Sequence, residues 1–301
     1  MLGFNYKIEK NEDTVLINPN AWIENNSNKI QRYRLSGRDV TTYITKVLDT
    51  HIVVNDIEGL INAGDEVLLT RIVSDVCQYR GFLGPDQVTK YFPVPILQVI
   101  GIFKDSEKTL GSLDVLFDKI IYKKVECQSN ALIQGVEGHS NIGEVVKTGT
   151  NRFTDSWEKQ PLQVKVGDTI LVKDNVSTEI MLNGETYYVV EESGVIGIFD
   201  GSVSLNDLRV INNSILLEQY IPEKMSSQSL LWTPNINYED LDYSEIYCRN
   251  QFKVAYLDEN LTSLKKDDIV IIDRNVTVYT YFQNQKYFVT NGMSYVEGRR
   301  I

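Results

Sequence analysis

Cysteine and proline are both scarce in this sequence. Only three Cys and seven Pro occur among 301 residues. Cys77, Cys127 and Cys248 lie far apart, and no CxxC or CxxH pair is present, so neither a disulfide framework nor a zinc ribbon is indicated. So few prolines also exclude a collagen-like or proline-rich linker protein. We therefore expect a folded protein with reduced thiols.

Long apolar runs and excess positive charge are missing as well. No stretch approaches the roughly 18 apolar residues of a membrane span, and residues 1–15 carry charge where a signal peptide needs an apolar run. With 30 Lys+Arg against 41 Asp+Glu, the net charge is −11, whereas binding nucleic-acid phosphates requires a basic surface. The sequence thus predicts neither a membrane partner nor a nucleic-acid partner.

Groups that could perform catalysis are few. The two histidines are His51 and His139, and His139 lies in the glycine-rich segment 135–143. That segment lacks the GK[ST] of a phosphate loop, and a histidine beside a serine in sequence is not thereby oriented for proton transfer. The acidic clusters at 191–192 and 239–242 lack the spacing of a calcium loop. We predict no catalytic residue, no metal and no cofactor, and hence no enzyme.

Strand-forming residues, by contrast, are abundant and occur in three similar units. Seventeen Tyr and frequent Val and Ile favour strands, and Gly, Asn and Asp mark turns between them. Aligning Gly64, Gly167 and Asp267 brings three turns and the apolar strands that follow them into register. The three segments are NAGDEVLLT at 62–70, KVGDTILVK at 165–173 and KKDDIVIID at 265–273.

Further signals mark where each unit opens and closes. VIGIF occurs twice, at 99–103 and at 195–199, and 291–299 closes the third unit. Apolar opening strands are predicted at 14–18, 119–124 and 214–219. Asn183-Gly184 is the strongest two-residue hairpin signal.

The predicted units span residues 1–106, 107–203 and 204–301. Their joints at 104–112 and 200–207 are short and polar, so we expect no long flexible tether. Convincing amphipathic helices are absent, and closing a small sheet removes its edges. The sequence therefore predicts an all-β protein with three tandem small β-barrel domains.

Each unit also carries an apolar cluster within a polar loop. Two of the three tryptophans, Trp22 and Trp232, belong to these clusters. Each ring either folds back as a lid over its own barrel or inserts into a partner as an anchor, as exposed aromatics do at binding sites. The clusters are Ala21, Trp22 and Ile23; Ala131, Leu132 and Ile133; and Leu230, Leu231 and Trp232.

The middle unit resembles the GroES-type co-chaperonin family. The resemblance rests on KIIYKK at 119–124, GEVVKTG at 143–149, PLQVKVGDTILVK at 161–173 and VEESGVIGIFD at 190–200. The outer units follow the same plan more loosely. The resemblance implies a GroES-like barrel and a mobile loop whose apolar tripeptide docks on a chaperonin ring, here Ala131, Leu132 and Ile133.

Two features depart from that family. Its members are single domains assembled in rings of seven, whereas this chain has three units. In the loop, QGVEGHS at 134–140 replaces a run of small residues.

Two functions therefore compete at this point. The first is a structural protein that bridges neighbouring subunits, as an auxiliary capsid protein in the virion of a tailed phage, made in the host cytoplasm. Three divergent barrels on a repeating lattice would gain affinity by avidity. The second is a fused co-chaperonin-like protein of the cytoplasm that docks on a chaperonin ring. In both cases the partners are other protein subunits, bound by the apolar clusters.

Overall fold

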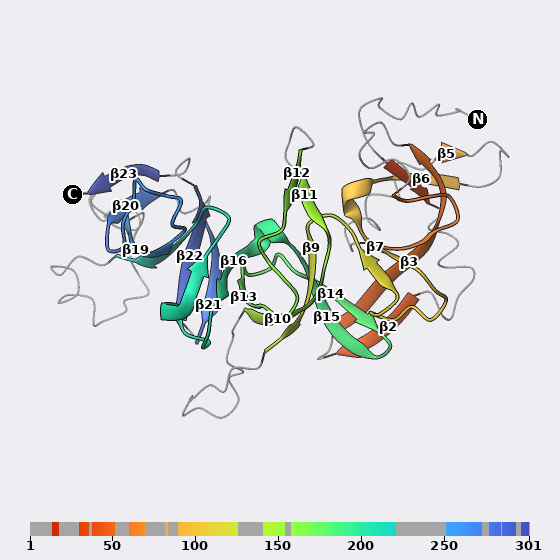
Figure 1. The fold of residues 1–301 in the computed structure, drawn as a ribbon, viewed down its shortest axis with the longest axis horizontal. Helices are drawn as coiled ribbons and strands as arrows, with labels where there is room; N and C mark the ends of the chain where they lie inside the picture. Colours follow the sequence, from red (N-terminus) through yellow and green to blue (C-terminus); the bar gives the residue numbers. More distant parts are fainter. Residues whose placement is uncertain are drawn as a thin grey trace, which may run out of the picture. The chain divides into compact units, whose positions relative to one another are not determined.

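β-strands joined by turns and short 3-10 helices make up the described part of this computed structural model, which confirms the all-β prediction (Figure 1). No α-helix occurs in that part of the chain. The structure describes residues 14–17, 30–35, 38–51, 60–69, 82–83, 90–125, 141–153, 158–220, 251–272, 277–283, 285–292 and 296–300.

The first sheet has eight strands in the order β5-β6-β1-β3-β4-β7-β8, and β2 pairs with β3. The predicted opening strand is present as β1, antiparallel to both β3 and β6. The bounds are β1 Thr14–Ile17, β2 Ile30–Leu35, β3 Arg38–His51, β4 Glu66–Leu69, β5 Phe82–Leu83, β6 Lys90–Pro95, η2 Ile96–Gln98, β7 Val99–Phe103 and β8 Leu113–Val115.

The second sheet has seven strands in the order β14-β15-β9-β10-β13-β16-β17, and β11 and β12 form a separate pair. Its opening strand is β9 and the second VIGIF segment is β16. The bounds are β9 Lys119–Lys124, β10 Ile142–Thr148, β11 Asn151–Phe153, β12 Lys159–Pro161, β13 Thr169–Val172, β14 Thr178–Leu182, β15 Glu185–Glu191, η3 Glu192–Gly194, β16 Val195–Phe199, η4 Leu205–Asp207 and β17 Leu208–Val210.

The third sheet has six strands in the order β21-β22-β18-β19-β20-β23. The predicted strand at 214–219 is β18, and the closing strand is β23. The bounds are β18 Ser214–Gln219, β19 Gln251–Leu257, β20 Ile269–Ile272, β21 Val278–Phe282, β22 Gln285–Asn291 and β23 Val296–Arg300.

The three turns used for the repeat alignment adopt the same left-handed backbone. Gly64, Gly167 and Asp267 have φ values of 99°, 91° and 70°. This conformation is easy for glycine and tolerated by aspartate, which explains why these residue types occupy the position. The hairpin signal is confirmed too, since Asn183 and Gly184 have φ values of 51° and 81° between β14 and β15.

Two short strands after the predicted joints each complete the preceding sheet. β8 pairs antiparallel with β7, so that Phe103 faces Leu113. β17 pairs in the corresponding register with β16, and Phe199 faces Leu208. From here on, the first joint and the second joint mean these two strand pairings together with the polar segments before them, 104–112 and 200–207.

Each joint lies within one compact unit of the chain. These compact units differ from the three units predicted from the sequence. What we call the first unit from here on comprises Met1–Lys123, Val145–Val166 and Ser177–Glu192. The second unit comprises Lys124–Glu144, Gly167–Val176 and Ser193–Ile301. Residues at corresponding positions of the two joints belong to the buried core of their own unit. These are Ile100, Phe103, Leu113 and Val115 in the first unit, and Ile196, Phe199, Leu208 and Val210 in the second. The predicted three-domain boundaries stay a prediction.

Within the described part of the chain, no helix has the length and apolar character needed to span a membrane.

Candidate functional site

The nine residues of the apolar clusters lie outside the described residues. The flanking strands nevertheless show where each cluster is inserted in the fold. Residues 18–29 follow β1, residues 126–140 connect β9 to β10, and residues 221–250 connect β18 to β19. In the first and third sheets the opening strand pairs antiparallel with β3 and β19, respectively. In the second sheet, β9 and β10 are neighbours. The three clusters therefore occupy corresponding topological positions.

The segment that carries Ala131, Leu132 and Ile133 has a closed base. The backbone N–H of Val125 donates to the carbonyl of Ile142, with an N–O distance of 3.1 Å. This bond joins the residue before the segment to the start of β10. The described residues on either side of the segment are thus held together by neighbouring strands.

Asn141 fixes the C-terminal end of the segment through both its backbone and its side chain. Its N–H donates to the carbonyl of Tyr281 at 3.1 Å, and its carbonyl accepts from Val172 N–H at 2.8 Å. The side-chain amide donates to Asp174 Oδ1 at 3.3 Å and to Thr280 Oγ1 at 3.4 Å. Asn141 thereby connects the segment to β13 and β21 within the second unit.

Thr280 completes this network from a fully buried position. Its hydroxyl donates to the Val172 carbonyl at 2.7 Å, and its residue exposure is 0%. A buried hydroxyl without a partner would be costly, so the bond favours one placement of β21 beside β13. The network therefore has a structural role at the base of the segment.

The base of the third segment is closed in a similar way. The N–H of Tyr220 donates to the carbonyl of Gln251 at 3.2 Å, and the Gln219 side-chain amide donates to the same oxygen at 3.2 Å. These bonds join the described residues on either side of 221–250, the stretch of sequence that includes Leu230, Leu231 and Trp232.

Two buried charged residues hold the second sheet's opening strand and its neighbouring loop. Lys119 is 2% exposed, and its Nζ lies 2.8 Å from Glu191 Oε1 and 3.4 Å from Asp118 Oδ1. Glu192 is 1% exposed and accepts the N–H groups of Gln163 at 2.6 Å and Val164 at 3.2 Å. Burial raises the pKa of Glu192, and the two backbone hydrogen bonds partly oppose that rise. The sequence does not predict this role for Glu192, because repeats and composition carry no signal for a buried anchor.

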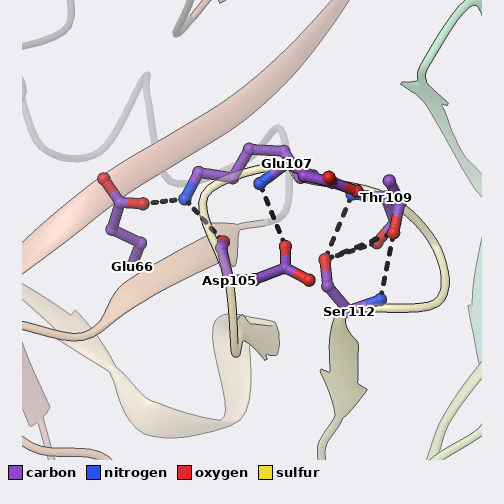
Figure 2. A network of polar contacts seen from close by, with 6 residues as sticks. Glu66, Asp105, Glu107, Thr109 and Ser112 are labelled. Carbon is purple, nitrogen blue, oxygen red and sulfur yellow. Dashed lines mark hydrogen bonds and ion pairs between the residues drawn. The ribbon is translucent and has the colours of Figure 1, made fainter.

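The segment before β8 is held by local polar contacts. Lys108 pairs with Glu66 of β4, and its ammonium also donates to the Asp105 carbonyl at 3.3 Å. Figure 2 shows Glu66, Asp105, Thr109 and Ser112 of this network. Thr109 and Ser112 exchange bonds, because Thr109 N–H donates to Ser112 Oγ at 3.1 Å and Ser112 N–H donates to Thr109 Oγ1 at 3.1 Å. The short polar character predicted for 104–112 thus corresponds to a turn bonded to itself and to β4.

Within the described ranges, no group of three His, Cys, Asp or Glu side chains is placed to hold a metal ion. His139 and the three cysteines lie outside those ranges.

The similarity to known proteins covers β8 and the second sheet as far as β16, with the segment between β9 and β10. Residues 113–199, from β8 to the end of β16, match the family model described as "Chaperonin 10 Kd subunit". The co-chaperonin GroES of Hydrogenobaculum sp. is 31% identical over 94 residues, which cover 98% of that protein and 29% of this chain. The chain belongs to the GroES co-chaperonin family. The co-chaperonin GroES of Shouchella clausii is 33% identical over 91 residues, 97% of its length and 29% of this chain.

These similarities confirm the resemblance stated from the sequence. They cover almost the whole of a GroES protein but less than a third of this chain. Of the two predicted functions, they favour the co-chaperonin-like protein over the virion protein.

Proposed function

We propose that the chain is a non-enzymatic, co-chaperonin-like protein of the cytoplasm that docks on a chaperonin ring. Docking uses residues 126–140, with Ala131, Leu132 and Ile133 as the apolar contacts. The observation that carries the proposal is the match over 113–199, which spans this segment and nearly the full length of GroES relatives.

The geometry at the base of the segment supports this role. The Val125–Ile142 bond and the four bonds of Asn141 fix both ends of the segment. A segment fixed at its ends and carrying one apolar tripeptide presents that tripeptide to a partner at a defined place. Burying Leu132 and Ile133 in an apolar groove would contribute about 1.5–3 kcal/mol each.

Binding to a nucleotide-loaded bacterial chaperonin ring, measured by calorimetry or co-sedimentation, tests the proposal. The 301-residue protein is expected to bind saturably. Leu132→Ser with Ile133→Ser should weaken binding at least tenfold, because both apolar contacts are replaced by polar groups.

A matched control carries Leu60→Ser with Leu97→Ser, two exposed leucines that belong to none of the apolar clusters. It makes the same chemical change outside the region of co-chaperonin similarity and should leave most of the binding intact. No binding by the unaltered chain, or equal binding by the Leu132–Ile133 variant, would overturn the proposal.

A further inference from the structure

A cavity of about 240 Å³ lies within the second unit, beside the second joint. Its lining comes from η4, from β19 and from the β21–β22 hairpin. The polar and aromatic residues that matter are Ser204, Asn206, Tyr256, Gln283, Gln285 and Tyr287. None of the lining residues is Lys, Arg, Asp or Glu.

Tyr287 contributes to this lining, and the residue as a whole is 4% exposed. Its hydroxyl makes no hydrogen bond to another described residue, and its oxygen is not fully buried. Burial, with the nearby Glu218 carboxylate, raises the pKa of Tyr287 to about 12. The group is therefore a neutral phenol at physiological pH, with a proton to donate.

The corresponding tyrosine of the β14–β15 hairpin is satisfied by a protein partner. Tyr187 faces Ile180 as Tyr287 faces Thr280, and its hydroxyl donates to Glu185 Oε2 at 2.5 Å. At the position of Glu185 the later hairpin has Gln285, whose side-chain amide donates instead to Glu218 Oε1 at 3.3 Å. Gln285 therefore does not bind Tyr287 as Glu185 binds Tyr187, and the Tyr287 hydroxyl can donate to a ligand instead.

The first joint also fills the corresponding space with a side chain. Lys147 donates from Nζ to the carbonyls of Leu110 at 2.9 Å and Gly111 at 3.2 Å. Ile142 of β10 faces Leu171 of β13 as Gln251 of β19 faces Ile271 of β20, so Ile142 and Gln251 occupy corresponding positions. Lys147 and Tyr256 each lie five residues further along their strands and therefore correspond to each other. The lysine closes the space at the first joint, whereas the Tyr256 ring lines a cavity at the second.

Gln283 adds a strained backbone position at the edge of the cavity. Its φ is 48°, in the left-handed region, where the earlier hairpin has Asn183 with φ 51°. Asparagine tolerates this conformation better than glutamine, and strained positions of this kind gather at ligand sites. The longer glutamine places its amide in the cavity lining.

We propose that this cavity binds a neutral saccharide. Hydroxyls and amides donate and accept the hydrogen bonds that sugar hydroxyls offer, and an aromatic ring packs against the apolar face of a sugar. None of the lining side chains is a cation, and the nearby Lys266 ammonium lies over the Tyr256 ring, 4.6 Å from its centroid. The Glu218 carboxylate beside Tyr287 disfavours an anion. The volume is below the roughly 300–1000 Å³ of pockets for drug-sized ligands, which suits a single sugar residue, free or at the end of a glycan.

Titration of the 301-residue protein with neutral hexoses and N-acetylhexosamines, followed by NMR, tests the proposal, and a glycan array distinguishes free from terminal sugars. Saturable binding of a neutral sugar is expected, with shifts at residues of β21 and β22. Tyr287→Phe, which removes only the hydroxyl, should weaken binding at least fivefold. Gln283→Asn should weaken it without lowering stability.

Tyr187→Phe is the matched control and should bind the sugar as the unaltered chain does. Equal binding by Tyr287→Phe would overturn the assignment, as would the absence of saturable binding by any neutral sugar. Preference for an acidic sugar would also contradict it, since the lining has no cation. Binding to a chaperonin ring is a separate property and is expected to survive Tyr287→Phe.

Discussion

At the scale of single residues, Glu192 links a buried charge to the placement of a loop. Its carboxylate accepts the Gln163 and Val164 N–H groups from a position that is 1% exposed. Burial raises its pKa in the folded state above the ordinary value. The folded protein therefore binds this proton more tightly than the unfolded chain, and stability is lost as pH rises from the unfolded pKa through the folded one.

Glu192→Gln should remove this pH dependence while keeping an oxygen that accepts both N–H groups. The difference in unfolding free energy between the two proteins, measured from pH 4 to 7, is expected to shift in favour of Gln as pH rises. Glu192→Ala leaves both N–H groups without an acceptor and should cost about 1–3 kcal/mol. A Gln variant whose stability follows the unaltered protein at every pH would contradict the argument.

At this scale, structure can be predicted from sequence where backbone geometry selects the residue type. The left-handed turns at Gly64, Gly167 and Asp267 could be read directly because few residue types tolerate that conformation. Glu192 and Asn141 were not predicted. Glu192 accepts backbone N–H groups that lie 28 and 29 residues away in the sequence. Asn141 donates to the carbonyl of Tyr281. Local sequence does not encode such distant partners.

At the scale of elements, the glycines of the two VIGIF strands permit the joints. A Cβ on Gly101 would lie 2.5 Å from the Asp114 carbonyl oxygen, and one on Gly197 would lie 2.7 Å from that of Arg209. Both distances are shorter than side chains tolerate. The added strands β8 and β17 can approach their neighbours because these positions have no side chain.

Gly101→Ala and Gly197→Ala are each expected to destabilise the protein by about 1–3 kcal/mol, the usual range for overpacking a buried site. Urea unfolding measures the loss. Gly111→Ala is the control, because its Cβ would meet only Thr109 Oγ1 at 3.5 Å, an ordinary contact. If all three variants unfold at the same urea concentration, close packing at the joints is not what the glycines provide.

Elements were predictable where a pattern recurs. The opening strands β1, β9 and β18 and both VIGIF strands appear at the predicted positions. The short strands β8 and β17 were missed, since three residues after a polar joint resemble the end of a linker. They are stabilised mainly by the sheet they join, with Leu113 at 0% and Val115 at 2% exposure, and such non-local pairing leaves only a weak trace in sequence.

At the scale of the whole molecule, charge and apolar clusters predict opposite responses to salt. With a net charge of −11, electrostatic attraction to a partner would be screened at high ionic strength, where the Debye length falls to about 3 Å at 1 M. Apolar anchors are not screened. Trp22 and Trp232 belong to clusters inserted at positions corresponding to that of the docking tripeptide, so several anchors on one chain would add by avidity on a repeating partner.

Trp22→Ala with Trp232→Ala should therefore weaken attachment to the chaperonin ring at high ionic strength, while the unaltered chain stays bound. Burying an aromatic side chain of about 150–250 Å² contributes a few kcal/mol, which the surrounding Asn and Ser side chains cannot replace. Trp157→Ala is the matched control, because it removes the third tryptophan without touching an apolar cluster. Circular dichroism and urea unfolding establish that each variant folds. Unchanged attachment of the double variant would identify the two rings as lids over their own sheets, and a lost fold would point to the same role.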